Sequence, residues 1–214
     1  MKKPFNLKKF SKYLLSLVGY VLLVAADEFF APFAIPLLIA NVYIGLSPLL
    51  SCALFVAAYL LSLSISVTAV AAMSGAVAAI FFLITNKIGK KPNFSLALIT
   101  AVALAPYVLV RDCHNLTVRL ILAGVCVPLV FVFVSAAKVF LVKGLKYRLS
   151  TDEIVSAAAL FSVASYGAIN LFSAPVYECF AVAAILISGM IMRRSCCSVT
   201  AIISALPLFF NTEN

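Results

Sequence analysis

Few residues in this chain have the type and spacing that catalytic or metal chemistry requires. The single histidine, His114, stands in the polar segment 111–115, where an imidazole would act as a general base or a metal ligand. A lone histidine in a loop is more often simply solvated. The sequence contains no phosphate-binding, dinucleotide-binding, zinc-protease or nucleophile-elbow motif. We therefore predict no catalytic, cofactor-binding or metal-binding residues, and a protein that is not an enzyme.

Two asparagines, Asn41 and Asn170, are the polar residues that lie most clearly inside apolar runs. Within lipid, such side chains form hydrogen bonds between helices, and the alternative role is contact with a transported substrate. Ionisable residues stand at the ends of the runs, as Asp27, Glu28 and Glu178 do, where they would reach water. The scarcity of charge inside the runs weighs against a pump or a proton-coupled transporter.

A helix start is predicted at residues 150–153, Ser-Thr-Asp-Glu. Ser150 and Glu153 have the spacing of a capping box, in which each side chain accepts a hydrogen bond from the backbone N–H of the other. The acids also favour the positive end of the helix dipole. This motif is structural, because it places a basic loop before a capped helix.

The six cysteines do not have the spacing of a disulfide framework or a zinc site. Cys52 and Cys126 lie in apolar runs, where a free thiol acts as a small hydrophobe. Cys113 and Cys179 fall at the same predicted face of the membrane, yet nothing in the sequence shows that they meet. We predict that both are free thiols.

The elements that must position these residues are membrane helices. Of the 214 residues, 65% are apolar and 11% are charged, and the mean hydropathy is +1.18. Soluble domains are about half apolar and a quarter charged, so soluble globular folds, disordered chains and coiled coils are excluded. The net charge of +9 comes from short basic clusters between apolar runs. This pattern indicates cytoplasmic loops facing anionic lipid, and we predict no nucleic-acid partner.

Nine apolar runs are separated by polar residues or turn signals. A first run that ends at Val24-Ala25-Ala26 resembles a signal peptide, and we favour an uncleaved first span because many apolar segments follow. Residues 31–62 are too long for one crossing, since 32 residues make a helix of about 48 Å, and Gly45-Leu46-Ser47-Pro48 supplies a break. The predicted spans are 13–26, 32–45, 48–62, 67–85, 94–110, 120–141, 154–171, 176–192 and 199–210.

The basic residues favour one orientation of these spans. With nine spans and a cytoplasmic N-terminus, 14 of the 16 Lys and Arg residues lie inside, and only Arg111 and Arg119 lie outside. A single long helix in place of the hairpin would put the cluster Lys87, Lys90 and Lys91 on the other side from the N-terminus. The hairpin therefore agrees with the charge distribution.

Residues 145–156, Leu-Lys-Tyr-Arg-Leu-Ser-Thr-Asp-Glu-Ile-Val-Ser, run into an Ala-rich helix, and residues 30–35 read Phe-Ala-Pro-Phe-Ala-Ile. In these stretches the chain resembles the membrane region of the stage II sporulation protein E family, and the resemblance extends over most of the chain. In that family, a multispanning N-terminal region anchors a cytoplasmic serine/threonine phosphatase at the sporulation septum. The chain has no phosphatase domain, so the resemblance implies a stand-alone or truncated membrane module and carries no catalytic residue over.

The sequence thus predicts an all-α fold, a polytopic transmembrane bundle of about nine spans, or eight if the last run is re-entrant or peripheral. We expect a basic cytoplasmic N-terminus (1–12), a helical membrane domain (13–210) and a short polar tail (211–214). The preferred function is that of a non-enzymatic bacterial inner-membrane protein that packs its helices with itself or with membrane partners in the lipid bilayer. The alternatives are a small-molecule permease or the substrate-binding membrane subunit of a transporter and, third, a membrane-embedded enzyme.

Overall fold

In the residues that the computed structural model describes, all regular secondary structure is helical. These residues are 7–26, 32–62, 65–88, 92–110, 115–143, 149–191 and 194–211. In chain order the elements are α1 (Leu7–Ala25), α2 (Ala34–Tyr43), α3 (Pro48–Ser62), α4 (Ile65–Ile88), α5 (Pro92–Val110), α6 (Leu116–Lys138), the π-helical turn η2 (Val139–Lys143), α7 (Thr151–Leu171), α8 (Ala174–Ile191) and α9 (Arg194–Asn211). The predicted all-α class is confirmed.

Three helices are long and apolar enough to cross a membrane, as judged by length and composition. In the described ranges these segments are Val67–Ile84, Leu116–Lys143 and Thr151–Leu171. At the other extreme, α2 has 10 residues, or about 15 Å of helix, half the thickness of a ~30 Å hydrocarbon core. α2 is therefore too short to cross alone, and the count of nine spans stays a prediction.

Several helices extend beyond the apolar runs that predicted them. α1 begins at Leu7 rather than at residue 13, so part of the segment 1–12 is helical, and α9 begins at Arg194 and includes Asn211. Lys and Arg are good helix formers, so the hydrogen-bond ladder continues where the apolar pattern stops. Hydropathy marks the part of a helix suited to lipid, not the whole helix.

The predicted break between residues 45 and 48 separates α2 from α3. Gly45 has a φ of 102°, a left-handed conformation that glycine adopts without steric cost. The backbone N–H of Leu46 donates to the carbonyl of Asn41, which satisfies one of the last carbonyls of α2. Pro48 then begins α3, where its missing N–H costs no helical hydrogen bond.

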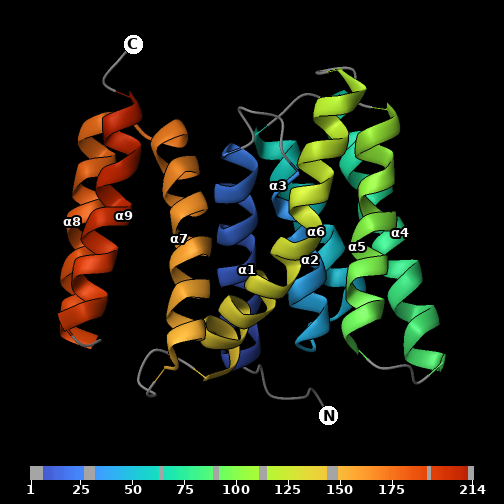
Figure 1. The fold of residues 1–214 in the computed structure, drawn as a ribbon, viewed down its shortest axis with the longest axis horizontal. Coiled ribbons are helices and arrows are strands. Elements are labelled where there is room, and N and C mark those ends of the chain that lie inside the picture. Colours follow the sequence, from blue (N-terminus) through green and yellow to red (C-terminus); the bar gives the residue numbers. More distant parts are fainter. Residues whose placement is uncertain are drawn as a thin grey trace.

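The helices run up and down in one bundle (Figure 1). The start of α1, the end of α4, the end of η2 and the starts of α5, α7 and α9 lie at the same end of it. α7 packs against α1 and α6 on one side and against α9 on the other, so the pair α8 and α9 forms one edge of the bundle. The basic side chains of Lys12 and Lys143 line one groove at the end where the chain starts.

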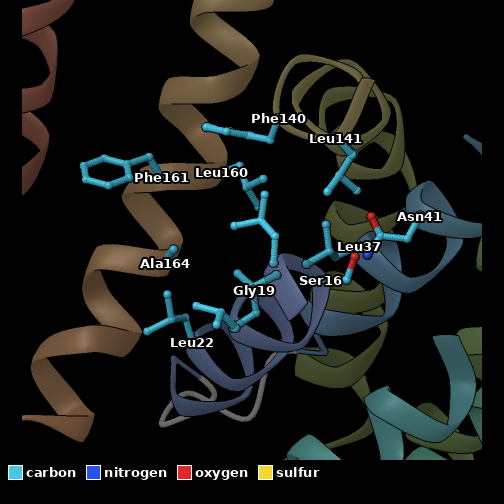
Figure 2. Close-up of a pocket in the computed structure, with 14 residues that line it drawn as sticks. Ser16, Gly19, Leu22, Leu37, Asn41, Phe140, Leu141, Leu160, Phe161 and Ala164 are labelled. Carbon is cyan, nitrogen blue, oxygen red and sulfur yellow. The ribbon is translucent and has the colours of Figure 1, made fainter. Parts of the chain in front are cut away.

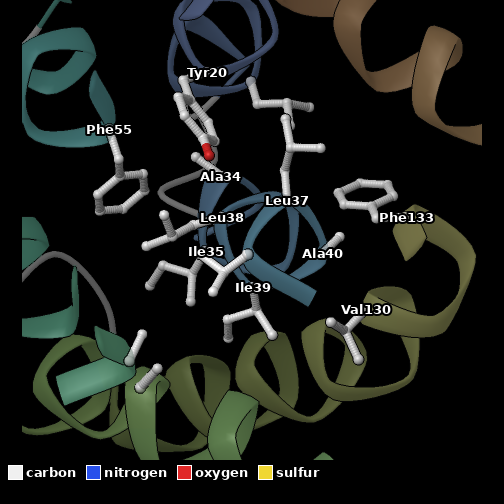
Figure 3. Close-up of a cluster of buried hydrophobic side chains, with 14 of the residues drawn as sticks. Tyr20, Ala34, Ile35, Leu37, Leu38, Ile39, Ala40, Phe55, Val130 and Phe133 are labelled. Carbon is white, nitrogen blue, oxygen red and sulfur yellow. The ribbon is translucent and has the colours of Figure 1, made fainter. Parts of the chain in front are cut away.

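The short helix α2 lies at the centre of the core. Residues 34–42 are all buried, and a helix that is apolar all round is stable when its neighbours cover it. Tyr20 and Phe55 lie on one side of α2, and Val130 and Phe133 lie on another (Figure 3). The Tyr20 and Phe55 rings meet edge to face, with centroids 5.8 Å apart, an arrangement that aromatic quadrupoles favour.

Candidate functional site

Asn41 and Tyr20 form a polar contact in the middle of the bundle. Asn41 lies near the end of α2, and its Nδ2 donates to the Tyr20 hydroxyl of α1 at 2.9 Å. The two side chains are 1% and 0% exposed. A hydrogen bond between helices, the role predicted for Asn41, is therefore present, and it sets the orientation of the side-chain amide.

Some buried side-chain oxygens have no hydrogen-bond partner within the described part of the chain. They belong to Asn41 (Oδ1), Ser51 and Ser74. Leaving such a group unpaired costs about 1–3 kcal/mol. A serine hydroxyl can turn about its own bond, whereas the bond to Tyr20 fixes the amide of Asn41. The Asn41 oxygen is therefore the least adaptable of the three.

A cavity of about 140 Å³, open to the outer surface at Leu15 and Val18, lies between α1, α2, α6, η2 and α7. Its lining side chains are apolar except for Ser16 and Asn41. The Ser16 hydroxyl already donates to the carbonyl of Lys12 at 2.8 Å. Figure 2 shows Asn41 and Phe161 at opposite ends of this space, with Leu160 between them. Asn41 Oδ1 is itself fully buried, so the cavity borders the residue without exposing its unpartnered acceptor.

Asn170 lies elsewhere, in the last turn of α7. Its Nδ2 donates to the backbone carbonyl of Ala25, the last residue of α1, at 3.0 Å, and its side chain is exposed. A turn earlier, the backbones approach so closely that a Cβ on Gly167 would lie 1.7 Å from the carbonyl oxygen of Leu22. Small residues permit such approaches between helices. The structure therefore does not bring Asn41 and Asn170 together.

The predicted capping box is present at the start of α7. The Ser150 hydroxyl accepts from the backbone N–H of Glu153 at 3.3 Å, and Glu153 Oε2 accepts from the backbone N–H of Ser150 at 3.0 Å. Glu153 Oε1 also forms a salt bridge with Lys143 at the end of η2. The cluster joins two consecutive elements and has a structural role.

Several residues considered from the sequence lie outside the described residues: Asp27, Glu28, Lys90, Lys91, Arg111, Asp112, Cys113 and His114. The side chains of Lys87, Cys196 and Cys197 lie outside them as well. Of the described cysteines, Cys179 is exposed and Cys126 is buried. The Cys52 thiol donates to the carbonyl of Gly75 at 3.2 Å. Within the described ranges, no three His, Cys, Asp or Glu side chains gather where they would hold a metal ion.

Sequence reasoning did not single out Tyr20, Gly167 or the cavity. Tyr20 is 21 positions from Asn41, and an aromatic residue in an apolar run gives no sign of its partner. Gly167, a glycine in an Ala-rich helix, indicates close packing but not against which helix.

Comparisons of the chain with protein-family models, with curated proteins and with solved structures find no match.

Proposed function

We propose that this chain is a non-enzymatic, multispanning membrane protein that acts by packing its helices with a second copy or with other membrane proteins. A bilayer location is supported by the outer surface: Leu49, Leu61 and Leu109 are each about three quarters exposed. Exposed large apolar side chains occur on every described helix except α2, and so much apolar surface is unfavourable in water and suited to lipid. The charge distribution favours a cytoplasmic N-terminus in a bacterial inner membrane.

The observation that carries the proposal is the separation of the intramembrane polar groups. Asn41 bonds to Tyr20 in the core, while Asn170 bonds to the end of α1 at the surface. Ser74, a further buried polar residue, does not line the cavity that Asn41 lines. A transporter for a polar substrate needs polar groups that converge on one midplane cavity. Polar groups that each form a separate hydrogen bond between two helices are typical of a packing module.

The resemblance to the membrane region of the stage II sporulation protein E family agrees with this role, because that region serves as an anchor. Under this proposal, the chain supplies a helical platform in a bacterial membrane, and its binding energy comes from van der Waals packing on lipid-facing helices. A small-molecule permease is the second candidate. The cavity of about 140 Å³ favours it, for an apolar rather than a polar molecule.

In-membrane photocrosslinking tests the proposal. A photoreactive amino acid would replace Leu109 of α5 or Phe180 of α8, which are 76% and 43% exposed and lie near opposite edges of the bundle (Figure 1). The matched control carries it at Phe133, which is 0% exposed. We expect adducts of dimer mass, or of a discrete larger mass, from a surface position and none from Phe133.

Two outcomes would contradict packing as the function. One is adducts with lipid alone from both surface positions in native membranes. The other is saturable uptake of a small molecule by proteoliposomes that hold the isolated protein in monomeric form, which would favour the permease.

A further inference from the structure

We propose that the groove between α1 and η2 binds one anionic phospholipid of the surrounding bilayer, with its phosphate beside Lys12 and Lys143 and an acyl chain deeper in the groove. The groove has a volume of about 670 Å³. Its walls are basic at one end and mostly apolar elsewhere, which is the pattern of a phospholipid. This inference rests on the bilayer location proposed above, but not on packing with partner proteins.

The wall that α1 provides is amphipathic along its length. The residues at positions 11, 14, 15 and 18 line the groove, and this spacing puts them on one face of the helix. Leu14, Leu15 and Val18 are 52%, 45% and 47% exposed, so the face is open to lipid. About 9 Å of helix separates Lys12 from Val18, close to the depth of one headgroup layer, about 5–8 Å. With Lys12 at the level of the headgroups, Val18 lies among the acyl chains.

The opposite wall is the π-helical turn η2, of which residues 140–143 line the groove. The chain from α6 into η2 slants toward the start of α1 at the lower end of the bundle (Figure 1). Turns of this kind are rare and occur frequently at functional sites. Leu15, Val18 and Phe140 also line the cavity of about 140 Å³. The groove therefore continues from its basic end into an apolar space that suits hydrocarbon.

The charges at the basic end match one phosphodiester. Lys143 Nζ forms a salt bridge with Glu153, and an ammonium group has three N–H donors, so it can contact a phosphate as well. The two lysines and Glu153 together carry one net positive charge, and a phosphodiester carries one negative charge. A zwitterionic headgroup would bring a further cation next to the lysines. Basic pockets between helices on the cytoplasmic side bind anionic headgroups, and this end is cytoplasmic in the proposed orientation.

Tryptophan fluorescence in bilayers of defined composition tests the site. The chain has no tryptophan, so Phe140→Trp places a single such fluorophore in the groove and keeps an aromatic ring there. The full chain is reconstituted in phosphatidylcholine with increasing fractions of phosphatidylglycerol or phosphatidylcholine whose acyl chains are brominated and quench tryptophan on contact. One charge near the membrane surface changes affinity about fivefold. We expect a binding constant for phosphatidylglycerol relative to phosphatidylcholine of about five.

Three further substitutions, each combined with Phe140→Trp, separate the charges of the groove from charge in general. Lys12→Gln leaves no net charge at the basic end and should lower the relative binding constant to about one. Lys138→Gln is the matched control, because Lys138 lies over the Tyr43 ring and does not line the groove, and it should leave the constant unchanged. Glu153→Gln keeps a residue that serves in a capping box and should raise the constant about fivefold.

Phe131→Trp reports contact with the bilayer alone, since Phe131 is 39% exposed and does not line the groove, and both lipids should quench it equally. A relative constant of one at position 140, or equal decreases in Lys12→Gln and Lys138→Gln, would overturn the site. Quenching at position 131 with none at position 140 would also overturn it, but would leave the bilayer location intact. Absence of quenching at both positions would contradict the bilayer location itself, and the site with it.

Discussion

Replacing Gly167 with alanine tests the closest approach between two helices. A Cβ at this position would lie 1.7 Å from the carbonyl oxygen of Leu22, 2.8 Å from its carbonyl carbon and 2.9 Å from the backbone nitrogen of Ala26. All three are backbone atoms, so no change of rotamer relieves the overlap. Because non-bonded heavy atoms are comfortable at about 3.5 Å, α7 must move away from α1 by well over 1 Å.

The cost follows from what that movement removes. A gap of 0.5–1 Å already forfeits about a quarter to a half of the dispersion attraction across an interface. The bond from Asn170 to the Ala25 carbonyl, 3.0 Å in the structure, would be lost as well, at about 0.6 kcal/mol within a membrane. Overpacking costs about 1–3 kcal/mol, or more against rigid backbone, while alanine gains about 1 kcal/mol in helix propensity. We expect a net loss of about 2 kcal/mol in the free energy of unfolding.

Gly124→Ala is the matched control, because a Cβ at that position in α6 meets no atom within 4 Å. The assay is the temperature at which half of the purified protein loses its monodisperse peak in size-exclusion chromatography. A loss of 2 kcal/mol corresponds to a decrease of roughly 4–8 °C for a chain of this size, whereas Gly124→Ala should show no decrease. Equal midpoints for the two variants would refute the close contact between α1 and α7.

Three further predictions concern the helix cap and the topology. Ser150→Ala removes the acceptor for the Glu153 N–H and should lower the stability by about 1 kcal/mol, seen as a lower midpoint in the same assay. A membrane-impermeant maleimide on intact cells should label Cys113 readily and Cys179 weakly. It should label Cys196 and Cys197 only after permeabilisation. Labelling of Cys196 from outside would reverse the predicted orientation. A topology reporter fused after Asn93 should give a cytoplasmic signal. Replacing Lys87, Lys90 and Lys91 by Gln should make that signal less uniform. An external signal in the parent would contradict the nine-span topology.

The sequence by itself determined the class of the fold and some of the helix boundaries. The break at Gly45 and Pro48 and the cap at Ser150 and Glu153 appear where the residue types predict them. These features depend on neighbours within four residues along the chain, through φ preferences, missing N–H groups and side-chain acceptors. The full extent of α1 was missed because hydropathy does not register helical lysines.

Only the tertiary structure decided which helices meet and what lies between them. Tyr20 as the partner of Asn41, Leu22 against Gly167, and the cavity follow from how α1 lies against α2 and α7. In an apolar bundle, nearly every helix face is chemically alike, so hydrophobic periodicity does not select one neighbour over another. The choice is made by shape, where small residues let backbones touch and bulky ones keep them apart, and a cavity is the space that this packing leaves unfilled.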